Sequence, residues 1–442
     1  MTRKRTTYVS YSDIKRKRRK RVFCVSIFTA AILIAAGLFL LIRHISNVVQ
    51  TQETLSDRSS DEPLLVSGPD VISVDNILSA SDNAMQPDPD GQDAAGISSA
   101  EEWVSFSERE DRVRVRGIYI TGPMAGSEGM ENLINLIDST ELNAVVIDVK
   151  NDEGIITYQM DLQTVQEMGA CVNYIRDMEG LIAELKEHNI YTIARIVCFK
   201  DPYLAEHNPE LSLKKADGSN LTDANGLTWV NPYQEEVWTY LTDVALAAAD
   251  MGFDEIQYDY VRFPVGNDAE SADYGVDIQS YPKEQVIRDF LDYAAERLHE
   301  RGIPVTADVF GTIIGSDIDV KQVGQDYVGL GATVDVLCPM IYPSHYGKGV
   351  FGFDVPDAYP YETVYQALLA SKSELAGIAD ENRAVVRPWL QAFTATWVNG
   401  HIDYGGDEIR QQIQAVYDAG YEEWILWNAS NRYTEEGLEK VE

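Results

Sequence analysis

The sequence predicts an α/β protein whose main part is a closed (β/α)8 barrel, preceded by a transmembrane helix and a disordered acidic linker. From residue 113 onward, short β-branched apolar runs alternate with amphipathic helical patterns, and eight such units fill the rest of the chain. Glycine often follows a helix just before the next strand, as at Gly252, Gly302 and Gly420. Strands that alternate with helices pair in parallel, which favours a TIM barrel.

An open, doubly wound sheet is the alternative architecture. Such a sheet commonly carries a glycine-rich phosphate turn after its first strand. Residues 122–126 (GPMAG) lack both the GxGxxG pattern and the GK[ST] ending, so a nucleotide site is poorly supported and the closed barrel is favoured.

The N-terminal residues predict a membrane anchor. Residues 22–42 contain no charge and span about 31 Å as a helix, the thickness of a hydrocarbon core. The basic run 15–21 (KRKRRKR) precedes them, which places residues 1–21 in the cytoplasm as a basic tail and the C-terminal domain outside the cell, behind a single-pass signal-anchor. A cleaved signal peptide is the alternative, but the apolar run is long and no convincing A-x-A site follows.

Residues 43–112 are rich in Ser, Asp, Pro and Gly and predict a disordered acidic linker, because they offer too little apolar surface to offset chain entropy. Residues 113–442 form the predicted barrel domain. The strands are expected at 114–121, 144–150, 191–199, 254–261, 304–311, 334–342, 384–393 and 423–428. The clearest helices are expected at 173–188, 234–251, 283–301, 361–375 and 407–419, whereas 316–333 is a weaker pattern and the helix after the last strand is truncated.

The charge excludes some partners. The chain has 36 Lys and Arg against 71 Asp and Glu, a net charge of −35, and the first 43 residues are strongly basic, so the remainder is still more acidic. Such a body repels phosphate backbones, which excludes nucleic acid and disfavours strongly anionic polymers. The four cysteines form no CxxC or Cys/His pattern, so we expect neither a metal site nor a cofactor, and Cys198 and Cys338 are expected as buried free thiols.

In a (β/α)8 barrel, catalysis takes place at the C-terminal ends of the strands. Charged side chains inside apolar strands are costly to bury unless they are paired, and six of them are expected to converge there. These are Asp148, Lys150, Arg195, Asp259, Asp308 and Arg387. Neighbouring candidates for substrate binding are Gln257, Tyr258, Tyr260, Arg262, Tyr342, Trp389 and Trp427, and His345 also follows a strand end. Carboxylates surrounded by aromatic rings are suited to sugar chemistry.

Three segments carry a resemblance to a known family. They are 116–119 (RGIY), 143–150 (NAVVIDVK) and 253–264 (FDEIQYDYVRFP), and the resemblance extends from about Val115 to Tyr433. The chain resembles the "putative glycosyl hydrolase domain" of bacterial envelope proteins, which is similar to the TIM-barrel glycosidases related to α-amylases and chitinases. This resemblance implies a catalytic carboxylate at the end of strand four, at Asp259. Chitinase-like enzymes carry DxxDxDxE there, whereas this chain has Val261 in place of the acid Glu.

The leading hypothesis is therefore a membrane-anchored extracytoplasmic glycoside hydrolase that acts on an envelope or extracellular polysaccharide. Asp259 is expected as the nucleophile or base, and Asp308, or else Asp148, as the general acid, while Lys150, Arg195 and Arg387 orient the substrate and keep Asp259 ionised. A non-catalytic carbohydrate-binding or cell-wall-organising module on a degenerate barrel is the alternative. A lyase or aldolase using Lys150 as a Schiff-base amine is a third hypothesis.

Overall fold

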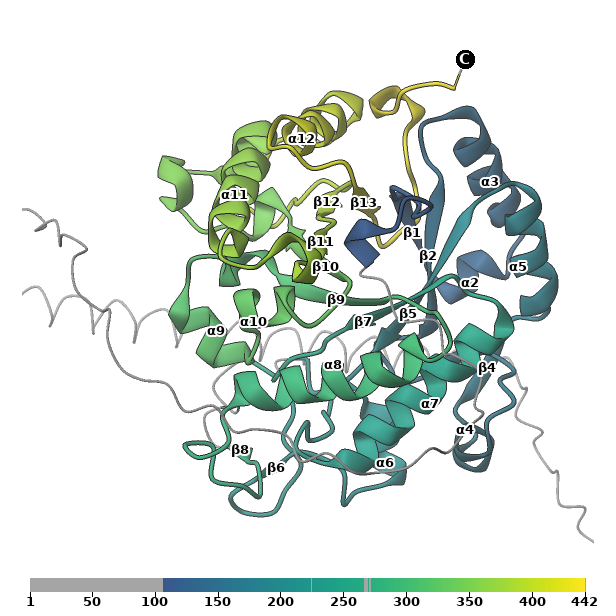
Figure 1. The fold of residues 1–442 in the computed structure, drawn as a ribbon, viewed down its shortest axis with the longest axis vertical. Coiled ribbons are helices and arrows are strands. Elements are labelled where there is room, and N and C mark those ends of the chain that lie inside the picture. The colour runs from purple at the N-terminus through teal and green to yellow at the C-terminus, as the bar shows by residue number, and fades with distance from the viewer. Residues whose placement is uncertain (1–105, 224, 266–268, 270–271, 442) are drawn as a thin grey trace, which may run out of the picture. The chain divides into compact units, whose positions relative to one another are not determined.

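The computed structural model describes residues 106–223, 225–265, 269 and 272–441, and in them eight strand positions close a parallel barrel (Figure 1). Their order around the barrel is β1-β13-β12-β10-β9-β7-β5-β2, and β2 pairs back onto β1. The strands are β1 (Arg116–Ile120), β2 (Ala144–Lys150), β5 (Tyr191–Val197), β7 (Glu255–Asp259), β9 (Val305–Phe310), β10 (Val336–Ile341), β12 (Trp389–Gln391) and β13 (Trp424–Trp427). The closure confirms the (β/α)8 prediction and excludes the open sheet.

Seven of the predicted strands end within two residues of the observed ones, and the seventh strand in sequence is the exception. The prediction was one strand over 384–393, but the structure has β11 (Val385–Val386) and β12, with Arg387 and Pro388 between them. Pro388 has no N–H to donate to a neighbouring strand, which accounts for the interruption. Both halves still pair with β10, so the barrel remains closed.

Helices cover the outside of the barrel (Figure 1). Four predicted helices are confirmed as α7 (Glu235–Met251), α8 (Lys283–His299), α11 (Pro360–Leu375) and α12 (Gly406–Asp418). The others are α2 (Gly122–Ala125), α3 (Gly129–Ser139), α4 (Gln163–Met168), α5 (Met178–Glu187), α6 (Pro202–His207), α9 (Asp317–Val323) and α10 (Tyr327–Gly331). Gly252, Gly302 and Gly420 all have positive φ, as their position after a helix predicts.

The helix predicted over 173–188 begins too early. Residues Cys171–Ile175 form strand β4, which pairs with the short β3 (Ile156–Tyr158), itself antiparallel to β2. Helix α5 starts only after Asp177, whose Oδ1 accepts a hydrogen bond from the amide of Gly180 at 2.8 Å. The excursion of β3, α4 and β4 therefore enlarges the loop after β2. A second small sheet, β6 (Lys214–Lys215) with β8 (Ala272–Asp273), joins the loops after β5 and β7.

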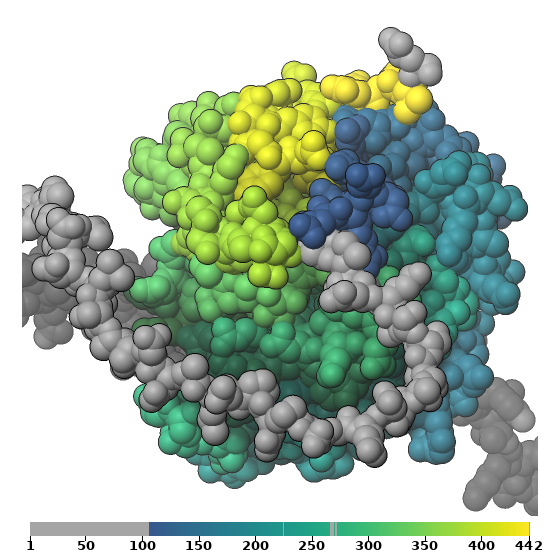
Figure 2. Space-filling model, in the orientation of Figure 1, coloured from purple at the N-terminus to yellow at the C-terminus, as the bar shows by residue number. Residues whose placement is uncertain are grey.

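The described chain begins inside the predicted linker. Residues Phe106–Glu108 form a short 3-10 helix, η1, and Phe106 is buried with Val115 at the N-terminal end of the barrel. The last residues of the stretch 43–112 are thus packed against the barrel, because burial of the Phe106 ring removes its apolar surface from water. Figure 2 shows these first described residues, in dark blue, beside the C-terminal part in yellow.

The predicted membrane span, residues 22–42, lies outside the described residues. Among the helices that the structure does describe, none combines the length and the apolar character needed to cross a bilayer.

Side chains alternate along the strands between two cores. One core fills the barrel interior and includes Val146, Ile193, Cys338 and Ile425. The larger core lies between strands and helices and includes Ile147, Ala194 and Ile256. The period of two therefore places every second residue of a strand inside the barrel, where polar residues must find partners.

The N-terminal end of the barrel interior holds a buried ion cluster, and Arg387 belongs to it. The Arg387 guanidinium donates to Glu255 Oε1 at 2.6 Å and to Glu423 Oε2 at 2.9 Å, and all three side chains are essentially inaccessible. Glu255 also accepts from Thr306 Oγ1 at 2.6 Å. The expectation that Arg387 orients a substrate is therefore wrong in placement, because it lies at the starts of the strands rather than at their ends.

This Arg387 cluster (Arg387, Glu255 and Glu423) is expected to stabilise the fold. Replacing Arg387→Met leaves Glu255 buried without its cation and Glu423 with Arg112 alone, so the free energy of unfolding should fall by about 3–5 kcal/mol. Urea denaturation of the full-length chain in mild detergent measures it. The control is Arg301→Met, since the Arg301–Asp250 pair is on the surface and should cost less than about 1 kcal/mol. Equal, small losses in the two variants would contradict this prediction.

Candidate active site

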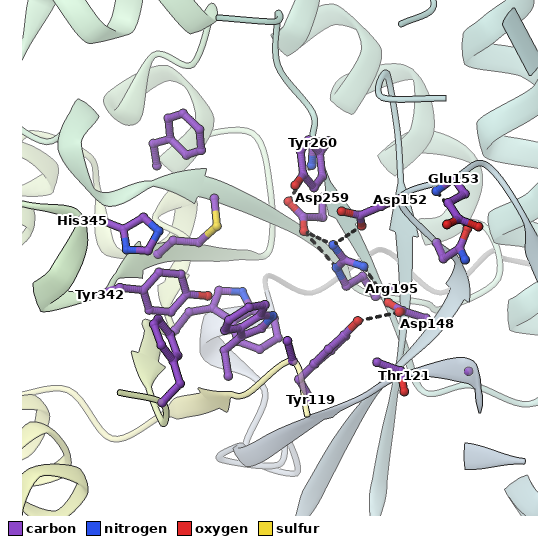
Figure 3. A pocket seen from close by; sticks show the side chains of 18 of the residues that line it. Tyr119, Thr121, Asp148, Asp152, Glu153, Arg195, Asp259, Tyr260, Tyr342 and His345 are labelled. Carbon is purple, nitrogen blue, oxygen red and sulfur yellow. Dashed lines mark hydrogen bonds and ion pairs between the residues drawn. The ribbon is translucent and has the colours of Figure 1, made fainter. Parts of the chain in front are cut away.

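A pocket of about 870 Å³ opens among residues at the C-terminal ends of the barrel strands. Its lining comes from β1, β2, β5, β7, β9, β10, β12 and β13 or from the loops that follow them. Figure 3 shows acidic and basic side chains on one side of this pocket and aromatic rings with His345 on the other. A pocket of this size accommodates a sugar ring with its neighbours.

Arg195 of β5 holds the polar side together. Its Nη1 donates to Asp148 Oδ1 at 2.6 Å, and its Nη2 donates to Asp259 Oδ2 at 2.6 Å and to Asp152 Oδ1 at 3.1 Å (Figure 3). Its Nε also donates to Asp259 Oδ2 at 2.9 Å. We call these four residues the Arg195 cluster. One guanidinium thus fixes three carboxylates with charge-assisted hydrogen bonds.

Asp259 closes strand β7 at a strained position. The next residue, Tyr260, has a φ of +50°, a conformation that a bulky side chain rarely adopts. Its amide donates to Asp259 Oδ1 at 2.6 Å. Both carboxylate oxygens of Asp259 therefore accept hydrogen bonds while the side chain faces the pocket, 7% exposed. Backbone strain of this kind concentrates at functional sites.

Two carboxyl groups of the Arg195 cluster, Asp148 and Asp152, differ in their protonation tendency. Burial raises the pKa of Asp148 above its usual value, although the Arg195 charge opposes this. Burial also favours the neutral form of Asp152, but the charges of Arg195 and Lys200 outweigh it and lower the pKa of Asp152 to about 2. Tyr119 donates its hydroxyl proton to Asp148 Oδ2 at 2.6 Å. The pocket therefore holds one carboxyl group, Asp148, that retains a proton more readily beside another, Asp152, that is ionised.

Aromatic rings form the opposite wall. Trp427 stacks on Tyr119 at 6.2 Å between ring centroids and lies 5.9 Å from Tyr342. Farther out, Trp397 stacks on Phe393 at 5.8 Å, and its side chain is 67% exposed although it lines the pocket. Flat apolar faces beside carboxylates are suited to the C–H surfaces of sugar rings.

Asp308 lies below the pocket rather than in its lining. Its Oδ1 accepts from Trp389 Nε1 at 2.6 Å and from Gln257 Nε2 at 2.8 Å, and the residue is only 1% exposed. Its Oδ2 has no hydrogen-bond partner in the described residues. Burial raises the pKa of Asp308 well above its usual value, and the nearby charge of Asp259 adds to the effect. Asp308 therefore supports the Trp389 ring from beneath.

Comparison with known proteins agrees with this geometry. A family described as "Putative glycosyl hydrolase domain" matches residues 117–433. The chain belongs to this family. No curated protein matches it significantly.

Two solved structures are similar to this chain. The glycoside hydrolase domain of PgaB (BpsB) from Bordetella bronchiseptica is 11% identical with a TM-score of 0.52, over 71% of this chain and 94% of that one, which shows a common fold. A hypothetical protein from Ruminiclostridium thermocellum is 37% identical with a TM-score of 0.40, over 43% of this chain and 97% of that one.

The structure brings most of the predicted residues of this family member to one pocket. Its lining contains Asp148, Arg195, Asp259, Tyr260, Arg262, Tyr342, Trp389 and Trp427, together with His345. Gln257 lies beneath the pocket with Asp308. Tyr258 faces the helices, and the centre of its ring lies 5.3 Å from that of the Phe290 ring. Tyr258 points outward because it alternates with Gln257 and Asp259, so its assignment to substrate binding does not fit its place.

Lys150 also lies elsewhere. The register of β2 against β5 shifts between Asp148 and Lys150, so the two residues do not share a face as their spacing predicted. Lys150 Nζ is fully buried, 2.7 Å from Asp201 Oδ2 and 2.7 Å from the carbonyl of Val197. A paired, enclosed ammonium does not reach a substrate carbonyl, which argues against the Schiff-base hypothesis.

Sequence reasoning missed four residues that shape the pocket. Tyr119 satisfies the strand-end rule that selected the others, whereas Asp152, Lys200 and Trp397 lie on loops beyond strand ends, where periodicity gives no signal. Lys200 Nζ donates to Asp152 Oδ2 at 3.1 Å and lies 4.5 Å from the centre of the Tyr260 ring. No grouping of three metal-ligating side chains occurs within the described ranges.

Proposed function

We propose that this chain is a membrane-anchored glycoside hydrolase that acts on an envelope or extracellular polysaccharide. The observation that carries the proposal is the pair of pocket carboxyl groups, Asp148 and Asp259, held on the same Arg195 guanidinium in an aromatic-walled cavity. Membership in the family supports the reaction class. One carboxyl group that supplies a proton and a second that acts as nucleophile or base are what acid-assisted glycoside cleavage requires.

In this proposal Asp259 is the nucleophile or base and Asp148 is the general acid. Asp259 accepts hydrogen bonds only from N–H groups, which stabilise its negative charge. Asp148 lines the pocket, and its burial favours the protonated form. Asp308, the first choice from sequence, is enclosed below Trp389, so it supports the site without contact with the sugar.

The exposed ring of Trp397 favours a polymeric substrate. A Trp that is 67% exposed and stacked on Phe393 leaves one apolar face uncovered at the rim of the pocket. Exposed aromatic rings commonly mark binding surfaces. A sugar unit next to the one being cleaved would cover this face, so we infer that several units of a glycan bind together.

Replacing Asp259→Asn tests the proposal directly. Loss of the carboxylate should reduce glycan hydrolysis by about 10²- to 10⁴-fold. Reducing-end release from cell-envelope glycans measures the rate, and circular dichroism checks that the full chain remains folded. The control is Asp250→Asn on the surface, which should keep the wild-type rate. Unchanged turnover in Asp259→Asn would refute the assignment, and glycan binding without any hydrolysis by the wild type would favour the non-catalytic module.

The acid role of Asp148 makes a separate prediction. A general acid matters most for poor leaving groups, so Asp148→Asn should lose about 10²- to 10⁴-fold on a natural glycan but far less on a dinitrophenyl glycoside. Because the acid must carry its proton, wild-type kcat/KM should fall as the pH rises through the pKa of Asp148, and the variant should lack this alkaline limb.

Asp152 provides the matched control for that experiment. It contacts the same Arg195 at 3.1 Å, yet its pKa of about 2 leaves it ionised. Asp152→Asn should therefore affect natural and activated substrates alike. A leaving-group effect in Asp152→Asn equal to that in Asp148→Asn would contradict the assignment.

The anchor is proposed from residues 15–42. Protease added to intact cells that produce the chain should release the barrel domain, while an N-terminal tag stays protected inside. The barrel should otherwise remain with membranes after an alkaline carbonate wash. Protection of the barrel would reject this topology, and its recovery free in the medium without protease would indicate a cleaved signal peptide instead.

A further inference from the structure

Arg262 is a cation on the pocket wall that pairs with no carboxylate in the part of the chain that the structure describes. It follows strand β7, lines the pocket and is only 7% exposed. Its Nη1 donates to the carbonyl of Phe263 at 2.8 Å, and across the described ranges it forms no ion pair with an acidic side chain. By contrast, Arg195 in the pocket lining and the neighbouring Lys200 are both paired with carboxylates.

Aromatic rings hold this guanidinium in place. Its Cζ lies 4.4 Å from the centre of the Phe310 ring, 4.9 Å from that of Trp229 and 5.0 Å from that of Tyr260. Such contacts fix the orientation of a cation without neutralising its charge. The left-handed turn at Tyr260 brings the segment carrying Arg262 against these rings. Arg262 is therefore preorganised rather than a mobile surface side chain.

The acidic groups around Arg262 are already engaged. Asp223 accepts hydrogen bonds from Trp229 Nε1 at 3.4 Å and from the amide of Leu227 at 3.0 Å. Asp152 and Asp259 are bound to Arg195. Burial lowers the pKa of Arg262, although the charges of Asp259, Asp223 and Asp152 oppose this. Such a charge is costly to keep unless a ligand supplies the partner.

We propose that Arg262 binds an anionic substituent of the glycan, a carboxylate or a phosphate ester on a sugar unit. This inference rests on the proposed function and adds the substrate class to it. A guanidinium presents N–H groups in a planar fork that matches the oxygens of either group. One caged cation is suited to one charge per repeating unit, because the acidic body of this chain repels densely charged polymers.

Binding of simple anions tests this inference without requiring hydrolysis. The full-length chain in mild detergent is titrated calorimetrically with D-glucuronate, D-glucose 6-phosphate and neutral D-glucose. At least one anionic sugar should bind more tightly than glucose, and Arg262→Met should weaken that binding by about 10- to 100-fold. Arg262→Lys keeps the charge but loses the planar fork of N–H groups, so its affinity for that anionic sugar should lie between those of the wild type and Arg262→Met. Preference for glucuronate identifies a carboxylate, and preference for glucose 6-phosphate identifies a phosphate ester.

Two results would overturn the proposal. One is that neither anionic sugar binds better than glucose at tens of millimolar. The other is that the anion preference persists in Arg262→Met, which would assign it to a different cation. Arg301→Met, on the surface, is the control for a general loss of positive charge and should bind like the wild type. Failure of the Asp259→Asn experiment leaves this binding measurement unaffected, so the two proposals fail separately.

Discussion

The pairing of charges that are removed from water inside the barrel governs this structure. Two arginines provide this pairing at opposite ends. Arg387 binds Glu255 and Glu423 at the starts of the strands, where all three side chains are enclosed. Arg195 binds Asp148 and Asp259 at the ends of the strands, where a cavity opens above them. The two clusters have the same chemistry and differ in whether a ligand can reach them. The enclosed cluster contributes to the fold, whereas the cluster below the cavity can contact a substrate.

Strand β7 contributes side chains to both ends of the barrel interior. Glu255, Gln257 and Asp259 point into the barrel at three successive depths, the first in the Arg387 cluster, the second beneath the pocket and the third inside it. Tyr258 packs outward against Phe290. The strand ends at Asp259. The next residue, Tyr260, has a positive φ, donates its amide hydrogen to Asp259 and redirects the chain toward Arg262. One strained residue thus positions both the carboxyl group of Asp259 and the caged cation of Arg262.

The sequence was sufficient for the fold and for much of the pocket, and the failures have a common physical cause. A period of two tells which face of a strand a residue occupies but not how deep it lies along the barrel axis. Arg387, Asp308 and Asp259 all face inward, yet they lie near the bottom, in the middle and at the top. The prediction for Lys150 was wrong for a different reason, because a register shift after Asp148 places Lys150 off the expected face of the strand. Asp152 and Trp397 belong to loops, whose paths depend on tertiary contacts that strand periodicity does not encode.

The charge of the whole body and the charge at Arg262 act over different distances. Repulsion from the acidic surface acts across about 8–10 Å at physiological salt and grows with the number of anionic groups on an approaching polymer. The attraction of a buried guanidinium is local and saturates with one partner, since its aromatic cage leaves little room for a second. Together they select against polyanions and for a glycan whose charges are sparse. A basic surface with the same pocket would bind any acidic polymer and lose that discrimination, so the acidic exterior is itself part of the specificity.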